Sequence, residues 1–129
     1  MSLNSLIQQL ADFDTALIAN TIGYVDPTPA HEWYMGRTIA SITPTVGPTV
    51  GIAMTCEIDT STPGNRAEFD LYYELLEAIQ RSATPVVLVI KAVGARPDHE
   101  GVIGDGMAKM LHSVGCVGAA KGTGGDDGL

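Results

Sequence analysis

Two neighbouring carboxylates near the end of the chain are the first candidates for chemistry. The last fifteen residues, GCVGAAKGTGGDDGL, place Asp126 and Asp127 side by side among six glycines. Carboxylate oxygens are ligands that Mg²⁺ prefers, usually one or two of them completed by water. Adjacent aspartates at a chain terminus are more often simply solvated, so the pair alone does not predict a metal site.

A second candidate is the glycine-rich stretch GVIGDGM, in which Gly101, Gly104 and Gly106 precede or open a predicted helix. Unpaired backbone N–H groups and the helix dipole at such a position favour an anion, either a carboxylate or a phosphate. The stretch matches neither the dinucleotide-binding fingerprint nor the Walker loop. Glycines also permit a tight turn without any ligand, and both interpretations stay open.

Other reactive residues give weaker signals. His31, His99 and His112 lack metal-ligand spacing, and the chain has no Ser-His-Asp arrangement or nucleophile elbow. Cys56 and Cys116 lie in apolar runs without CxxC spacing, which predicts reduced, buried thiols and a cytoplasmic protein.

The elements that must position these groups follow from the apolar spacing. Two short helices are expected at the N-terminus, the second capped by Asp14 and ended by Gly23, followed by a loop over 24–37. Beyond them we expect a strand at 38–46, a strand at 49–58 buried on both faces, a helix ending near Ser82, a strand at 84–92, a helix at 104–114 and a strand at 115–120.

The order of these elements predicts one α/β domain of 129 residues with a mainly parallel βαβαβ core. Ligands of such sheets bind beyond the carboxyl ends of the strands. Those ends are Asp59, the loop after Lys91 and the glycine-rich tail.

The charge balance excludes some partners. Fifteen acidic and seven basic residues give a net charge of −8, with no cluster of lysine or arginine, so we expect no nucleic-acid binding. No apolar run approaches the ~18 residues that a membrane span requires, and the N-terminus does not resemble a signal peptide.

The stretch GDGMAKMLHSVGCVGA resembles the RraA-like family, which includes the regulator of ribonuclease activity A and the 4-hydroxy-4-methyl-2-oxoglutarate aldolases with oxaloacetate decarboxylase activity. TALIANTIG, GPTVGIAMTCEID and TPVVLVIKA also resemble family segments, so the similarity covers nearly the whole chain. Some members are labelled demethylmenaquinone methyltransferases, but the sequence has no nucleotide loop of the kind a methyltransferase would use.

The resemblance implies a swivelling β/β/α fold, a homotrimer or hexamer, and a site between subunits. It implies that the backbone amides of Gly104, Asp105, Gly106 and Met107 hold the carboxylate and ketone of a small 2-oxo acid. It further implies a Mg²⁺ or Mn²⁺ ion attached through a motif aspartate, an arginine beside it, and additional strands beyond Leu129, so that the domain is incomplete at its C-terminus.

Two alignments of the tail with the family motif are open. Without a gap, Asp127 falls on the metal-binding aspartate and Asp126 replaces the arginine; with a shortened motif, Asp126 is the metal ligand and the arginine is deleted. In both alignments Asp126 and Asp127 are the candidate catalytic and metal residues.

The resemblance predicts a metal-dependent aldolase or decarboxylase that releases pyruvate from 2-oxo acids. The absent arginine predicts a low rate, because a cationic side chain stabilises the enolate that forms. The alternative is a non-catalytic oligomeric regulator that binds a protein partner.

Overall fold

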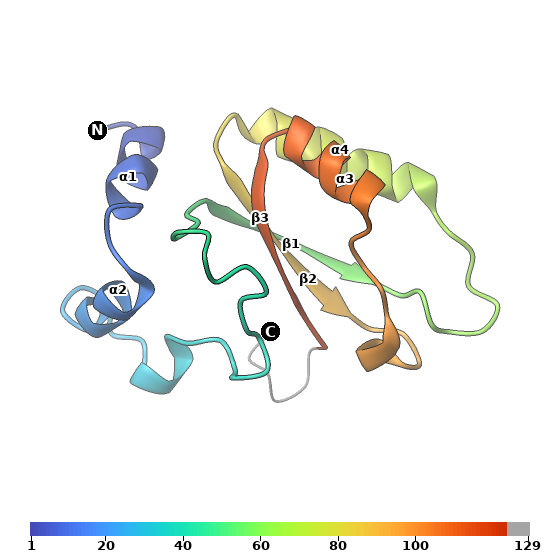
Figure 1. The fold of residues 1–129 in the computed structure, drawn as a ribbon, viewed down its shortest axis with the longest axis horizontal. Coiled ribbons are helices and arrows are strands. Elements are labelled where there is room, and N and C mark those ends of the chain that lie inside the picture. The colour runs from blue at the N-terminus through green and yellow to red at the C-terminus, as the bar shows by residue number, and fades with distance from the viewer. Residues whose placement is uncertain (124–129) are drawn as a thin grey trace.

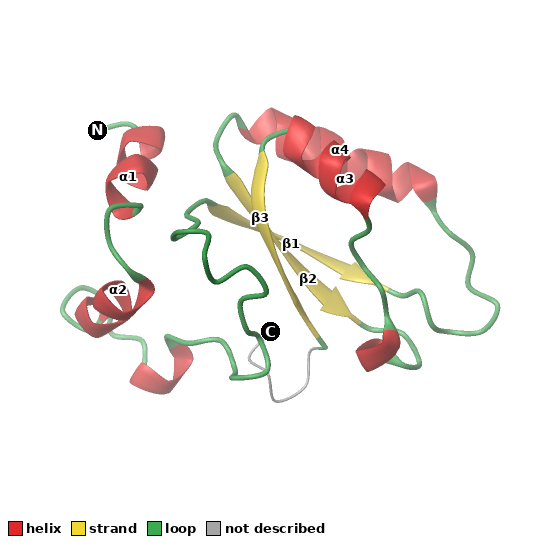
Figure 2. Ribbon diagram, viewed as in Figure 1, coloured by secondary structure: helices red, strands yellow, loops and turns green. Residues whose placement is uncertain are grey.

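A three-stranded parallel sheet forms the centre of the protein. The computed structural model describes residues 1–123 and shows a mixed α/β fold with strand order β1–β2–β3 (Figure 2). The strands are β1 (Ile52–Ile58), β2 (Val86–Ala92) and β3 (Cys116–Gly122). Ile52 pairs with Val86, and β3 joins β2 with a register shift next to Val86.

Two helices connect the strands and cover one face of the sheet. They are α3 (Phe69–Ser82) and α4 (Asp105–Ser113), which lie together on one side of the sheet in Figure 1. Right-handed crossovers between strands added in one direction place successive helices on the same face. The consecutive order of the strands therefore accounts for the shared face.

The core lies between the central strand and these helices. Val86, Leu88 and Ile90 of β2 have no exposed surface, and they pack with Ile79 of α3 and Leu111 of α4. Alternate residues of a strand point to the same face, so every second residue of β2 enters the core. The confirmed βαβαβ order thus follows from apolar side chains at strand and helix spacing.

The two predicted N-terminal helices are present as α1 (Leu3–Leu10) and α2 (Thr15–Ile22). The Ser2 hydroxyl caps α1 by accepting from the Ser5 amide at 3.2 Å, and Asp14 Oδ1 caps α2 by accepting from the Leu17 amide at 2.7 Å. Both helices lie to the left of the sheet in Figure 1. The predicted loop that follows contains one short 3-10 turn, Ala30–Glu32.

The strand predicted at 38–46 is wrong, because that segment contains neither strand nor helix. Its β-branched residues favour extended backbone, but Pro44 and nearby Pro48 lack the N–H that a sheet ladder needs. The sheet is consequently limited to three strands in the described part of the chain.

Burial of β1 on both faces is also wrong. Ala53, Thr55 and Glu57 are exposed, whereas Met54, Cys56 and Ile58 are half-buried. The strand lies at the edge of the sheet. Both connecting helices cover the face that carries Met54, Cys56 and Ile58, and the face that carries Ala53, Thr55 and Glu57 is left uncovered by them. Among residues 1–123, no helix is long and apolar enough to cross a bilayer.

Candidate functional site

Four backbone N–H groups at the N-terminus of α4 have no acceptor in the described part of the chain. Gly104 occupies the N-cap position with extended backbone (φ −92°, ψ 175°), and no side chain caps the helix. None of residues 1–123 accepts a hydrogen bond from the amides of Gly104, Asp105, Gly106 or Met107. A Cβ added to Gly104 or Gly106 would meet nothing within 4 Å.

This arrangement, which we call the α4 mouth, brings together the four residues predicted to bind a substrate carboxylate. Uncompensated N–H groups and the positive end of the helix dipole favour a bound anion. The Asp105 carboxylate turns to Lys109, whose Nζ lies 2.7 Å from Oδ2 in an exposed ion pair. The predicted metal residues Asp126 and Asp127 lie outside the described residues.

The loops that follow β1 and β2 are joined by a buried glutamate. Glu100 is 6% exposed, and its Oε1 accepts from the Thr60 amide at 3.1 Å and from the Ser61 hydroxyl at 2.7 Å. The Ser61 oxygen in turn accepts from the Arg96 amide at 2.8 Å. We call this set of contacts the Glu100 latch; it fixes the loop that leads directly into Gly101 and the α4 mouth.

Gly94 leaves the space in which the oxygens of the latch lie. A Cβ at Gly94 would collide with Glu100 Oε1, Asp59 Oδ1 and Ser61 Oγ, which converge above its Cα. The second carboxylate oxygen, Glu100 Oε2, is buried and has no hydrogen-bond partner among the described residues. An unmatched buried oxygen costs free energy, so the latch holds its loops at some expense in stability.

Asp59 directly follows β1 and organises the loop after it. Interactions with the Thr62 side chain, and then with the Thr62 amide, lower the pKa of Asp59 from its ordinary value of 3.8. Asp59 Oδ1 accepts from the amides of Ser61 and Thr62 at 3.1 and 2.9 Å, and Oδ2 accepts from Asn65 Nδ2 at 2.5 Å. The carboxylate therefore acts as the acceptor at the centre of a tight turn.

This pKa shift predicts a specific acid sensitivity. A carboxylate whose pKa is lower in the folded state stabilises the fold above its unfolded pKa, and this contribution is lost as the pH falls through the folded value. In the original protein, the midpoint temperature of thermal unfolding should fall as the pH is lowered below 3.8. We expect this fall to be smaller in the Asp59→Asn variant. Thermal unfolding between pH 7 and pH 2.5 checks this.

The matched control is Asp12→Asn, which removes a carboxylate at an exposed position of the N-terminal segment. It should leave the pH dependence close to that of the original protein. An acid response of Asp59→Asn equal to that of the control would show that the turn does not depend on the ionised carboxylate.

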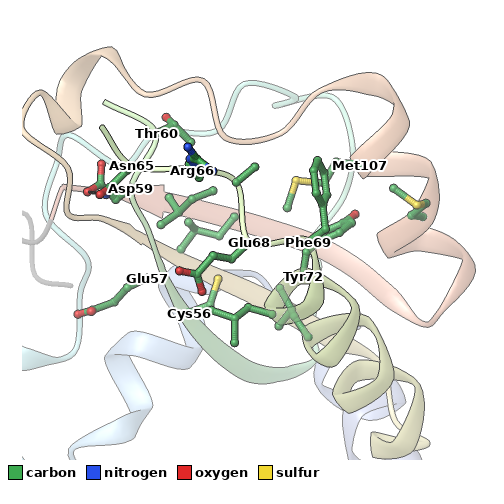
Figure 3. Close-up of a pocket in the computed structure, with 16 residues that line it drawn as sticks. Cys56, Glu57, Asp59, Thr60, Asn65, Arg66, Glu68, Phe69, Tyr72 and Met107 are labelled. Atoms are coloured by element: carbon green, nitrogen blue, oxygen red, sulfur yellow. Dashed lines mark hydrogen bonds between the residues drawn. The ribbon is translucent and has the colours of Figure 1, made fainter. Parts of the chain in front are cut away.

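A pocket of about 690 Å³ lies beside the α4 mouth, between the carboxyl half of β1 and the first turns of α3 and α4. We call it the β1 pocket. Figure 3 shows Asp59, Thr60, Asn65 and Arg66 toward one end of it and Phe69, Tyr72 and Met107 toward the other. The remaining wall is mostly apolar and includes Cys56, Ile58, Leu71, Leu75, Ile90 and Met110.

Two ionisable groups in the pocket wall are affected by burial. Burial raises the pKa of the Cys56 thiol, so this cysteine stays protonated and is a poor nucleophile near neutral pH. Burial, with a smaller contribution from Tyr73, also raises the pKa of Tyr72. The Tyr72 hydroxyl is buried without a hydrogen-bond partner among the described residues.

Sequence reasoning found the α4 mouth and Asp59 but missed several neighbours. The role of Arg66 and Tyr72 as pocket residues was not predicted, and neither was the latch formed by Glu100. Arg66 directly follows the turn STPGN, which comes after β1. Its place in the sequence could therefore have predicted a loop residue near the carboxyl end of that strand. Glu100 lies in a polar stretch and had no signal of burial.

Within residues 1–123, no group of three or more His, Cys, Asp or Glu residues could hold a metal ion. No protein-family model matches the chain, and neither a curated protein nor a solved structure matches it significantly.

Proposed function

We propose that this chain is an RraA-like aldolase or decarboxylase that releases pyruvate from 2-oxo acids. The observation that carries the proposal is the α4 mouth, where four amides from Gly104 to Met107 lack acceptors within the described chain. It lies at the carboxyl edge of a parallel sheet and beside a pocket. Ligands of parallel α/β sheets bind at that edge.

Cleavage of a 2-oxo acid needs hydrogen-bond donors for negative charge, and the amides of the α4 mouth can supply them. Cleavage of a 2-oxo acid next to its ketone leaves an electron pair on C3, and the resulting enolate carries negative charge on the ketone oxygen. Preorganised N–H groups stabilise charge that develops during a reaction. In this proposal the amides hold the substrate carboxylate, and one of them donates to the enolate oxygen as it forms.

The proposal includes a divalent metal ion bound by the last residues of the chain. The described residues do not provide a ligand set, so Mg²⁺ or Mn²⁺ would be held by Asp126 and Asp127, which lie outside them. A hard cation of this kind, when bound, polarises the ketone as a Lewis acid. Every other role in the proposal belongs to the chain's own residues.

The assembly and location are also proposed from the resemblance. A homotrimer or hexamer would cover apolar side chains that the single chain leaves exposed, including Leu17, Val25, Ile42, Phe69 and Val117. Cys56 and Cys116 are both free thiols, which agrees with the proposed cytoplasmic setting.

The same exposed residues favour the second candidate function, an oligomeric regulator that binds a protein partner. Leu3, Leu6 and Leu17 of the N-terminal helices are each more than two-fifths exposed. Exposed apolar patches mark protein interaction sites. Binding of a 2-oxo acid at the α4 mouth separates the two candidates, because a pure regulator does not need it.

Asp105→Pro tests the proposed anion site. Proline at the first helical position removes one N–H of the mouth while its fixed φ suits the helix, and the extended Gly104 before it tolerates a following proline. We expect pyruvate to bind about 10- to 100-fold more weakly, as for a lost hydrogen bond to a charged group. Isothermal titration with pyruvate measures the change.

The matched variant is Asp105→Ala, which keeps the N–H but removes the carboxylate and its ion pair with Lys109. It should bind pyruvate at least as well as the original protein, since a negative charge near the mouth is lost. Equal affinity of the proline and alanine variants, or no pyruvate binding by the original chain, would contradict the proposal.

A further inference from the structure

We propose that the substrate is a 4-hydroxy-2-oxo acid with an apolar, uncharged substituent at C4, and that the β1 pocket holds this substituent. An aryl group or a branched alkyl group is the kind of arm meant. The inference rests on the proposed function, because it takes the substrate carboxylate to lie at the α4 mouth.

The α4 mouth and the β1 pocket are adjacent because they share Met107. The Met107 amide is one of the four N–H groups of the mouth, and the same residue lines the pocket together with Met110, one turn farther along α4. Met107 lies at the end of the pocket where Figure 3 also shows Phe69 and Tyr72. A ligand that extends from the mouth into the pocket therefore meets apolar side chains first.

The size and lining of the pocket suit an apolar group. Its volume of about 690 Å³ is within the range of small-molecule sites, which are lined mainly by apolar side chains with a few polar groups. Ile58, Leu75 and Ile90 contribute apolar wall.

The charges around the pocket disfavour a second carboxylate on the substrate. The carboxylates of Asp59 and Glu68 line it, against the single cation Arg66 among the lining residues. The Glu57 side chain points away from the pocket in Figure 3 and pairs with Lys91, whose Nζ lies 3.6 Å from Oε1. Glu68 has no ion-pair partner among the described residues. A negatively charged arm would meet like charges and lose its hydration in an apolar space.

The proposed reaction balances without an added oxidant or reductant. The C4 hydroxyl gives up its proton to solvent, the C4–O bond becomes the carbonyl of an aldehyde, and the C3–C4 bond breaks. The electron pair of that bond passes to C3 as the enolate of pyruvate, which takes a proton from solvent. The products are pyruvate and an apolar aldehyde.

The first measurement compares three unreactive probes with the full chain by isothermal titration. The probes are pyruvate, 4-phenyl-2-oxobutanoate, which carries an apolar arm but no C4 hydroxyl, and 2-oxoglutarate, which carries a second carboxylate. We expect the phenyl compound to bind at least about tenfold more tightly than pyruvate, as for added apolar groups in a fitting pocket. We expect 2-oxoglutarate to bind no more tightly than pyruvate.

Two variants with matched controls locate the effect. Met110→Trp fills the pocket from its rim and should abolish the phenyl advantage while pyruvate affinity is kept; Met35→Trp makes the same change at an exposed position away from the pocket. Glu68→Gln should improve 2-oxoglutarate binding about threefold or more, whereas Glu74→Gln on exposed α3 surface should not. The glutamate pair decides the question if Met110→Trp does not fold.

The outcomes separate this inference from the proposed function. Pyruvate binding without a phenyl advantage, or with tighter binding of 2-oxoglutarate, overturns the inference and leaves the proposed function standing. Absence of binding for all three probes overturns both. A phenyl advantage that survives in a folded Met110→Trp variant places the arm elsewhere and also overturns the inference.

Discussion

Gly94→Ala is expected to destabilise the protein by about 1–3 kcal/mol, the usual cost of inserting a methyl group into a well-packed site. The new Cβ would collide with oxygens of Asp59, Ser61 and Glu100. These atoms hold one another through hydrogen bonds, such as that from Ser61 Oγ to Glu100 Oε1 at 2.7 Å. Denaturant unfolding at neutral pH measures the loss.

The same variant should also weaken pyruvate binding, because Glu100 directly precedes the glycine stretch that leads to the α4 mouth. Opening the latch frees that stretch to move. A loss of pyruvate affinity under conditions where the variant is fully folded, as judged by circular dichroism, distinguishes this local effect from global unfolding.

Gly101→Ala is the matched control for Gly94→Ala. It lies in the same connection, but a Cβ there would meet nothing within 4 Å, and its backbone is not in the left-handed region. We expect its stability to be unchanged or slightly raised, since alanine restricts the unfolded chain more than glycine. Equal destabilisation by both changes would show that the latch is not the reason.

Joint replacement of Asp126 and Asp127 by alanine is expected to reduce pyruvate release from oxaloacetate by about 10²-fold or more. The reason is that carboxylate oxygens are the principal ligands of a hard divalent cation, and neighbouring glycines offer no substitute. The rate of the original chain should require Mg²⁺ or Mn²⁺ and be lost with a chelator. A coupled assay for pyruvate measures the rate.

Asp126→Arg provides the reciprocal test of this metal site. In the ungapped alignment it restores the cationic residue that the family motif places beside the metal aspartate, so the rate should rise. Asp126→Ala is its control, because it removes the same carboxylate without adding a cation. Metal-independent release, or none before and after the arginine change, would favour the regulator over the enzyme.

Local signals in the sequence were enough to predict most of the elements. Asp14 predicted the start of α2, and its Oδ1 does cap that helix. The apolar spacing predicted the helix that ends near Ser82, which is α3, and the strands expected at 84–92 and 115–120 are β2 and β3. These features depend on residues within a few positions of one another, which is why a sequence carries them directly.

The segment around Pro44 shows where local preference fails. A run of β-branched residues favours extended backbone, but a strand exists only if a neighbouring strand accepts its hydrogen bonds. The sequence does not name that neighbour, and the structure provides none for 38–46. The exposure of Ala53 and Thr55 also depends on tertiary structure, because β1 lies at the edge of the sheet and the helices cover only its other face.

The candidate site divides in the same way. By itself, the sequence determined the α4 mouth, because its glycines and the following helix are adjacent in the chain. Only the tertiary structure decided that Glu100 contacts Ser61, 39 positions away, and that Arg66, Tyr72 and Met107 line one pocket. Those contacts follow from the parallel register of β1 and β2, which brings the ends of both strands to one edge; register is set by pairing between distant segments, not by local sequence.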